Sequence, residues 1–226
     1  MLLLKDRLET RIEMTPGNPD LQRSKTMIAN LITLFRLILA FVVISLFGYH
    51  IYLDILLVVL IGLILFLDAV DGYVARKLNQ TSDFGALFDI IGDRIVECIF
   101  WVYFAVVGLI PFWIPVIVIA RGFFTDGLRS AAFAQGKTAF GENTMMSSKW
   151  TRALTSSRIS RSIYGIAKAV AFIYLGGVIA FKNSGIHPEL IVGLELAGVI
   201  LSGVTVAMCL IRGLPVLVDG WKYVKE

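Results

Sequence analysis

The chain has 226 residues, of which 57% are hydrophobic and 17% are charged, and its mean hydropathy is +0.79. This composition excludes an ordinary soluble domain, in which about half of the residues are apolar, and it favours a protein that lies in a membrane. The net charge of +4 is modest. Most Lys and Arg residues flank apolar segments, so we expect membrane lipid and not nucleic acid as the partner.

The N-terminal segment, residues 1–29, is expected to lie on the cytoplasmic side. Within it, residues 3–13 place four apolar side chains near one helical face and charged residues on the others; the four are Leu3, Leu4, Leu8 and Ile12. This pattern predicts a short amphipathic interfacial helix at the membrane surface, with a frayed terminus as the alternative. The first apolar run is too short, and too soon followed by charges, for a signal peptide.

Six apolar segments follow, each close to the about 20 residues that a helix needs to cross the hydrocarbon core. They are residues 30–48, 51–75, 85–108, 111–133, 162–181 and 188–211. The sequence therefore predicts an all-α integral membrane protein with six transmembrane helices. We expect one domain over residues 30–212 and a cytoplasmic tail over residues 213–226.

The connections between these segments differ in charge. Lys and Arg residues gather before the first segment, between the second and third, between the fourth and fifth, and after the sixth. The remaining connections hold only Lys182. The positive-inside rule then places both termini on the cytoplasmic side of the inner membrane, and it predicts a polar cytoplasmic loop over residues 136–161.

Four aspartates lie where an apolar helix should carry none. Asp68 and Asp71 end the second segment, and Asp89 and Asp93 lie near the start of the third, although a carboxylate at membrane depth costs about 2.5–3.5 kcal/mol. Spacings of three and four put each pair on one helix face. Because four clustered carboxylates repel each other and oxygen ligands suit hard cations, we expect two divalent ions, Mg²⁺ or Mn²⁺, near the cytoplasmic interface. The alternative is four snorkelling charges without a chemical role.

Small residues and one cation accompany the aspartates. Gly72 and Gly85 lie on or near the carboxylate faces, where a missing side chain lets backbone or ligand approach closely. Ala75 is small on the same side. Arg76 offers a guanidinium near the water interface, which is suited to a phosphate.

Together these residues form a pattern at fixed spacing, Asp68-x2-Asp71-Gly72-x2-Ala75-Arg76-x8-Gly85-x3-Asp89-x3-Asp93. The pattern resembles the signature of the CDP-alcohol phosphotransferase family, whose six-helix topology is also similar to the one expected here. The resemblance implies a metal-dependent transfer of a phosphatidyl group from CDP-diacylglycerol, or from a CDP-linked ether lipid, to a small alcohol. The products would be a phospholipid and CMP, and the active site would face the cytoplasm. The resemblance also implies a homodimer.

The resemblance implies a role for each matched residue. The metal ligands would be Asp68, Asp71, Asp89 and Asp93. The residues lining the site of the CDP moiety would be Gly72, Ala75, Arg76 and Gly85. Asp93 would also act as the general base for the acceptor hydroxyl, which fits a transfer that depends mainly on positioning and charge neutralisation.

The choice of acceptor rests on other segments. Residues 30–36, 119–121, 128–129 and 136–137 resemble phosphatidylglycerophosphate synthases, a subfamily whose acceptor is glycerol 3-phosphate. A phosphorylated acceptor requires cations, and the candidates are Arg121, Arg129, Arg158, Arg161 and Lys168. The alternatives are a structural pair of Arg121 with Asp126 or Asp93, and ordinary loop or topology charges for the rest.

Several alternatives stay open. The fifth segment opens with Ser157-Arg158-Ile159-Ser160-Arg161, where that subfamily usually carries a Gly-Lys-x-Lys-Thr-type stretch, so inositol phosphate, another polyol phosphate or serine are further candidate acceptors. An ion-coupled membrane transporter also suits intramembrane carboxylates, but it predicts a mid-membrane cluster and inverted repeats. Arg36 is open between an acceptor contact and a structural role, and Arg94 is expected to pair with Glu97.

Overall fold

The computed structural model describes residues 19–77, 83–137, 144–185 and 187–223. Within these ranges, the backbone alone is described for residues 19–29, 68–77, 83–84, 86, 149, 152–153, 156 and 158. The predicted interfacial helix over residues 3–13 and the last three residues of the predicted tail lie outside the described residues.

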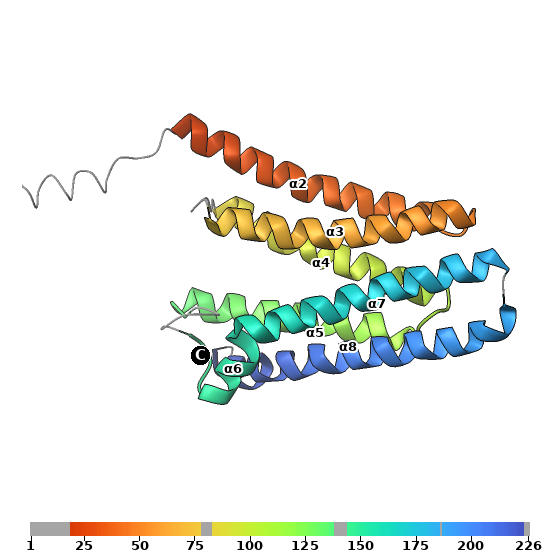
Figure 1. Cartoon of the computed structure of the whole chain (residues 1–226). Coiled ribbons are helices and arrows are strands. Elements are labelled where there is room, and N and C mark those ends of the chain that lie inside the picture. Colours follow the sequence, from red (N-terminus) through yellow and green to blue (C-terminus); the bar gives the residue numbers. More distant parts are fainter. Residues whose placement is uncertain (1–18, 78–82, 138–143, 186, 224–226) are drawn as a thin grey trace, which may run out of the picture.

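Six long antiparallel helices hold most of the described residues (Figure 1). They are α2 (Pro19–Leu46), α3 (Ile51–Lys77), α4 (Asp83–Val106), α5 (Trp113–Ala134), α7 (Arg158–Ser184) and α8 (Ile191–Gly220). The short helix α6 (Lys149–Ser156) precedes α7, and the 3-10 turns η1 (Pro188–Leu190) and η2 (Trp221–Tyr223) flank α8. Among the described residues there is no strand, so the all-α prediction is confirmed.

Each predicted apolar segment corresponds to one long helix, but several boundaries differ. α2 begins at Pro19 rather than at residue 30, and α8 continues past residue 211 to Gly220. The predicted loop of residues 136–161 contains α6 and the start of α7. Hydropathy marks the apolar part of a helix, whereas polar turns that extend it look like loops in the sequence.

Two helical segments are long and apolar enough to cross a membrane by length and composition, Ile159–Ser184 and Pro188–Tyr223. Shorter apolar helical segments run over Asn30–Leu46 and Ile51–Leu67. In α4 and α5, charged residues interrupt the apolar stretch. Membrane association is therefore supported by the described helices, while six crossings stay a prediction.

The two ends of the bundle are distinct (Figure 1). We call the end where α3 finishes and α4 begins the aspartate end, because the predicted aspartates lie there; the start of α2 and the end of α8 are at this end as well. The opposite end, called the far end, holds the connections α2–α3, α4–α5 and α7–α8. The predicted cytoplasmic side corresponds to the aspartate end.

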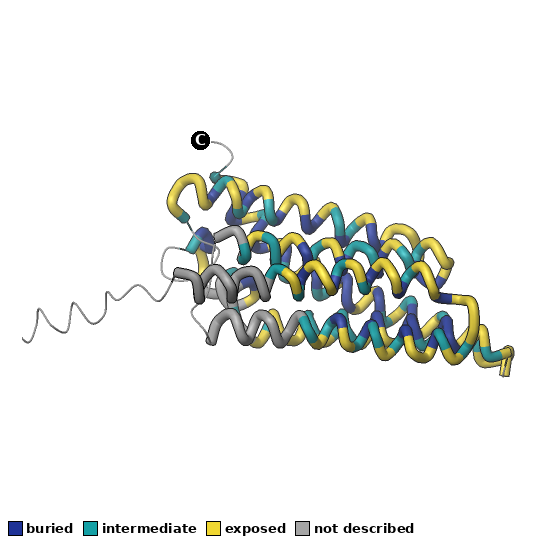
Figure 2. The backbone as a smooth tube through the Cα atoms, turned by 90° about the horizontal axis from the view of Figure 1, so that it is seen from above, coloured by how far each residue is buried: buried dark blue, intermediate teal, exposed yellow. Residues whose placement is uncertain are grey.

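Burial follows the inward faces of the helices, and the outward faces are exposed (Figure 2). Many exposed side chains are large and apolar, among them Val59, Phe123, Ile166 and Leu196, which are 60–77% exposed. Soluble proteins rarely expose so much contiguous apolar surface. The outer face of the bundle thus suits lipid.

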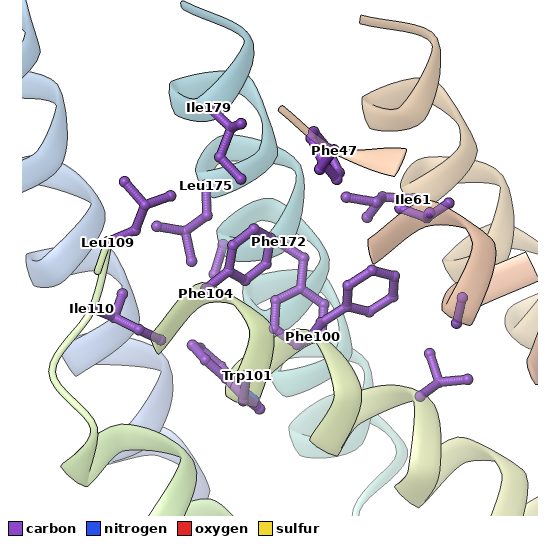
Figure 3. Close-up of a cluster of buried hydrophobic side chains, with 14 of the residues drawn as sticks. Phe47, Ile61, Phe100, Trp101, Phe104, Leu109, Ile110, Phe172, Leu175 and Ile179 are labelled. Atoms are coloured by element: carbon purple, nitrogen blue, oxygen red, sulfur yellow. The ribbon is translucent and has the colours of Figure 1, made fainter. Parts of the chain in front are cut away.

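Aromatic side chains close the interior between α4 and α7 in the middle of the bundle (Figure 3). The ring of Phe172 lies 5.3 Å from that of Phe100, 4.9 Å from Trp101 and 6.0 Å from Phe104, between centroids. Such pairs stabilise by about 0.5–1.5 kcal/mol each beyond the area that they bury. This aromatic cluster separates the polar groups nearer the aspartate end from the far end of the bundle.

The segment before α6 is tied to the end of α8. The backbone N–H of Ser147 donates to Asp219 Oδ2 at 2.9 Å, and Lys222 Nζ donates to Ser147 Oγ at 2.7 Å. Ser148 then caps α6 by accepting from the Thr151 N–H at 3.1 Å. These bonds fix the direction in which the chain enters α6 and α7 beside the polar interior.

Candidate active site at the aspartate end

The acidic row of α4 consists of Asp89, Asp93 and Glu97, which lie on one face because each is four residues from the next. Their side chains are 40%, 39% and 5% exposed. The row thus runs from the open aspartate end toward the aromatic core, with its last carboxylate buried. Asp89 and Asp93 are two of the four predicted metal ligands.

The other predicted ligands and most of the predicted nucleotide site are on the last turns of α3. The helical backbone of α3 reaches Lys77 and so includes all of these positions. The side chains that lie outside the described residues are Asp68, Asp71, Gly72, Ala75 and Arg76. Gly85, in the first turn of α4, is half-buried. The end of α3 and the start of α4 lie at the same end of the bundle (Figure 1).

Of the four predicted metal ligands, only Asp89 and Asp93 of α4 have described side chains, so the metal site can be tested on these two alone. Among the side chains that the structure describes, no group of three or more His, Cys, Asp or Glu could hold a metal ion. Asp89 and Asp93 do share a face and offer oxygen atoms, the donors that Mg²⁺ and Mn²⁺ prefer. The chemistry of the described pair fits the predicted ions, and the complete site stays a prediction.

Arg36 of α2 reaches the acidic row. Its Nη2 donates to Asp93 Oδ1 at 2.9 Å and its Nη1 lies 3.9 Å from Asp89 Oδ1, while the side chain is only 2% exposed. Close helix packing makes this contact, because a Cβ atom on Gly92 would lie 2.5 Å from Thr33 Cγ2. The sequence left the role of Arg36 open; the structure shows that it orients the predicted base.

Glu97 is the centre of a second network. Its Oε1 accepts a hydrogen bond from the Tyr164 hydroxyl at 2.5 Å, and its Oε2 lies 3.6 Å from both Lys168 Nζ and an Arg94 guanidinium nitrogen. The predicted Arg94–Glu97 pair is therefore confirmed. Arg94 makes closer contacts with Asp126, through Nε at 3.1 Å and Nη2 at 3.3 Å.

Asp126 also lies 3.5 Å from Arg129, so this carboxylate joins cations of α4 and α5. Among the described residues, neither Asp126 nor Asp93 forms an ion pair with Arg121, which was the alternative for this residue. Asp126 pairs with Arg94 and Arg129, and Asp93 pairs with Arg36. Arg121 instead packs against α8, where a Cβ atom on Gly213 would lie 2.6 Å from its Nε.

Three guanidinium groups gather beside these pairs, and we call Arg121, Arg129 and Arg212 the arginine cluster. Among the described residues, the Nε atom of each is buried and has no hydrogen-bond partner. Arg129 lies within electrostatic reach of the other two, and Arg212 lies over the Tyr164 ring, 5.2 Å from its centroid. Like charges with unused donors in a partly dehydrated place are unfavourable unless an anion joins them.

The predicted acceptor residues therefore have different surroundings. Arg121 and Arg129 are in the arginine cluster, and Arg161 lies within electrostatic reach of Arg212. Lys168 is paired with Glu97. The side chain of Arg158 lies outside the described residues.

Sequence reasoning missed Arg212, which it treated as a charge flanking the last apolar segment. The structure continues α8 from that point to Gly220, so Arg212 lies inside an apolar helix. A charge inside such a helix is costly and points to a functional contact. Following the apolar pattern beyond residue 211, through Leu214, Val216 and Val218, would have identified it.

A cavity of about 60 Å³ lies between α4 and α5. Its polar lining includes Arg94, Glu97 and Asp126, and its apolar lining includes Val118 and Phe123. Sites for drug-sized ligands measure about 300–1,000 Å³. This gap is therefore too small for a nucleotide.

The fold and the acidic row agree with a comparison to known families. Residues 26–211 match the family described as CDP-alcohol phosphatidyltransferase. The match covers most of the chain, including the acidic row, Arg121 and Arg129. The chain belongs to the CDP-alcohol phosphatidyltransferase family, as the sequence pattern predicted.

Curated relatives narrow the comparison. A protein of Bacillus subtilis named CDP-diacylglycerol–glycerol-3-phosphate 3-phosphatidyltransferase is 30% identical over 105 residues, which are 44% of this chain and 54% of the relative. Proteins of the same name from Mycoplasma genitalium and Wigglesworthia glossinidia brevipalpis are each 30% identical. Those alignments cover 54% and 53% of this chain and 59% and 64% of the two relatives. The chain thus spans between half and two thirds of the length of these three relatives.

Proposed function

We propose that the protein transfers a phosphatidyl group from CDP-diacylglycerol to glycerol 3-phosphate and releases CMP. Family membership over residues 26–211 supports the reaction class, and the names of three relatives support this donor and acceptor. The product would be a phospholipid with a phosphorylated glycerol headgroup. Inositol phosphate, another polyol phosphate or serine are the acceptors to be compared with it.

The observation that carries the choice of a phosphorylated acceptor is the arginine cluster. Arg121 is buried and Arg129 and Arg212 are half-buried, and the buried Nε atom of each has no partner among the described residues. Together they provide the charge and the hydrogen bonds that a phosphate requires. Serine, which has no phosphate, would leave these donors unsatisfied. The acceptor's phosphate would thus bind at Arg121, Arg129 and Arg212, with Arg161 and Arg158 as further candidates on α7.

The acidic row would supply the base for the acceptor. The contact of Arg36 with Asp93 at 2.9 Å fixes the direction of the carboxylate, which would accept the proton of the acceptor hydroxyl. The oxygen of the deprotonated hydroxyl then attacks the phosphorus of the phosphatidyl group, and the bond from that phosphorus to CMP breaks. Proton, nucleophile and leaving group are thereby all accounted for.

Divalent ions would be held by Asp68, Asp71, Asp89 and Asp93, and Mg²⁺ or Mn²⁺ fits oxygen-only ligands. When bound, such ions neutralise charge on the diphosphate and favour departure of CMP. Gly72, Ala75, Arg76 and Gly85 would line the CDP moiety. This part of the proposal is supported by the sequence pattern and by the shared face of the two α4 aspartates.

We further propose that all six long helices cross the membrane and that the aspartate end faces the cytoplasm. The exposed apolar side chains of the outer face support a lipid environment, and the placement of Lys and Arg residues supports the orientation. The tails of the donor would then stay in the bilayer while the nucleotide reaches water. A homodimer is part of the proposal through the family resemblance alone.

An acceptor panel tests the proposed function. Purified protein in liposomes would receive CDP-diacylglycerol, Mg²⁺ or Mn²⁺, and one of glycerol 3-phosphate, inositol phosphate, serine or glycerol, and both CMP release and the lipid product would be measured. We expect glycerol 3-phosphate to give the highest turnover, glycerol to give little, and a chelator to abolish turnover with every acceptor.

The panel separates the reaction class from the acceptor. Turnover that is highest with serine would contradict the phosphorylated acceptor but not the transfer. Absence of CMP release with every acceptor, together with uptake of an ion into the same liposomes, would favour the transporter alternative.

A further inference from the structure

Glu97 has no place in the proposed reaction, although it is among the most strongly engaged carboxylates that the structure describes. Its side chain is 5% exposed, and a carboxylate is costly to bury unless cations and hydrogen bonds compensate. Tyr164, Lys168 and Arg94 supply that compensation.

The location of the network is informative. Tyr164 and Lys168 are four residues apart, so they share one face of α7 and approach Glu97 from across the interior. The next large residues on the two helices belong to the aromatic cluster, in which Phe100 and Phe172 lie 5.3 Å apart. The contacts of Glu97 therefore lie at the inner end of the polar interior, next to the aromatic cluster.

The cations of the site differ in how they are paired. Glu97 holds Lys168 at 3.6 Å and also acts electrostatically on Arg121, but the buried Nε donors of the arginine cluster, that of Arg121 included, are accepted by no described group. Four residues, slightly more than one helical turn, separate Glu97 from Asp93, which is about 6 Å along the axis. A phosphate bound by an unpaired Lys168 would lie deeper than Asp93 and would carry its hydroxyl away from the base.

We propose that Glu97 is a positioning residue that pairs with Lys168 and so prevents this lysine from binding the acceptor's phosphate. The phosphate then binds at the arginine cluster, and the acceptor hydroxyl lies at Asp93. The inference rests on the proposed function for its substrate. It goes further by naming a residue that selects one of two phosphate positions.

The substitution Glu97→Gln tests the proposal because the amide oxygen can still accept from Tyr164 while the negative charge is lost. Lys168 is then released. We expect glycerol 3-phosphate to bind deeper and unproductively, so that kcat and KM for this acceptor fall together by about tenfold while kcat/KM stays nearly constant. Adding Lys168→Met to this variant should restore both parameters toward their original values.

A purely structural role of Glu97 would not give this pattern. A raised KM with unchanged kcat, or a loss of kcat that Lys168→Met does not reverse, would overturn the proposal. The matched control is Glu195→Gln, which breaks another Glu–Lys pair, that of Glu195 with Lys182 at 2.6 Å near the far end. We expect this control to keep the original kinetics, and thermal unfolding would show that each variant is folded.

Phosphate binding without turnover separates this inference from the proposed function. Isothermal titration of the full chain with inorganic phosphate should show about tenfold tighter binding in Glu97→Gln than in the original protein, and Lys168→Met should remove the gain. Equal phosphate affinity in the original protein and Glu97→Gln would overturn the inference even if the transfer reaction is confirmed. Conversely, the gain in affinity is expected whichever phosphorylated acceptor proves correct.

A second variant covers the case in which Glu97→Gln does not fold. In the otherwise original protein, Lys168→Met removes a cation that, by the proposal, does not contact phosphate. Phosphate affinity should then change by less than about twofold. A tenfold loss of affinity would show that Lys168 binds phosphate while Glu97 is present, and it would overturn the proposal.

Discussion

Buried polar groups are hydrogen-bonded differently at the two ends of the bundle. At the far end, the carboxylate of Asp54 is fully buried and both of its oxygens are used: Oδ1 accepts from the Gly48 N–H at 2.8 Å and Oδ2 from Asn183 Nδ2 at 2.5 Å. At the aspartate end, the arginine cluster brings like charges together and leaves buried donors without a described partner.

The difference indicates which end evolved for binding. Buried polar groups in folded proteins are nearly always hydrogen-bonded. The far end follows that rule, because the hydrogen bonds of Asp54 connect α3 to α7 and to the α2–α3 turn. Unused guanidinium donors are tolerated where a ligand completes them. The far end is thus a structural closure, and the unpaired donors at the aspartate end support the proposal that an anionic substrate binds there.

The largest effect is expected for Asp93→Asn. The variant keeps a side chain of the same size near Arg36 but cannot remove a proton from the acceptor. Since general bases contribute about 10²–10⁴-fold, kcat should fall by that range. CMP release in the liposome assay measures it.

The control for this variant is its thermal unfolding midpoint, which should stay close to that of the original protein. A fall in kcat of less than about tenfold in a folded variant is too small for loss of a general base. That outcome would contradict the assignment of Asp93.

The next effect concerns the arginine cluster. Replacing Arg121, Arg129 or Arg212 by Gln removes a charge-assisted contact of about 1.5–3 kcal/mol, so the KM for glycerol 3-phosphate should rise by about 10- to 100-fold. Lys at these positions should restore only part of the affinity, because it lacks the planar two-donor geometry of Arg. An unchanged KM in the Arg212→Gln variant would remove this residue from the site.

A smaller effect is expected for Gly213→Ala. The added methyl group would lie 2.6 Å from Arg121 Nε and 2.9 Å from its Cγ, so the arginine must move to a new position. We expect the acceptor KM to rise by about three- to tenfold, less than when the charge itself is lost. Gly203→Ala in the same helix is the matched control, because no atom outside its own helical neighbours lies within 4 Å of its added Cβ; an equal rise in both variants would contradict the explanation.

The smallest effect on the reaction is expected at the far end. Asp54→Ala leaves the Gly48 N–H and the Asn183 amide without their acceptor, which should lower the free energy of unfolding by about 1–3 kcal/mol. Acceptor KM and kcat should stay the same below the unfolding transition. A changed acceptor KM in a folded Asp54→Ala protein would show that the two ends are coupled.

Much of the fold could be predicted because it follows from local patterns. Apolar length identified all six long helices, and spacings of three and four placed the aspartates on shared faces. Boundaries were less accurate, because polar residues extend α2 before residue 30 and α8 runs past Arg212 to Gly220. Helix α6 was missed since its eight residues, Lys149–Ser156, are mostly polar.

Only the part of the site that lies on a single helix could be predicted from the sequence. Asp89 and Asp93 follow from the periodicity of α4, and so does the pair of Arg94 with Glu97. The contact of Arg36 with Asp93 depends on how closely α2 approaches α4 at Gly92, and no local pattern contains that distance. The pairing of Lys168 with Glu97 likewise joins residues far apart in the sequence.

The most direct test of the account is equilibrium binding of glycerol 3-phosphate to the protein in lipid nanodiscs without donor, compared with glycerol and with the Arg121→Gln variant. We predict saturable binding of glycerol 3-phosphate, no measurable binding of glycerol, and affinity lowered by about 10- to 100-fold in the variant. Equal binding of glycerol and glycerol 3-phosphate, or affinity unchanged in a folded Arg121→Gln protein, would contradict the claim that the aspartate end is completed by a phosphorylated acceptor.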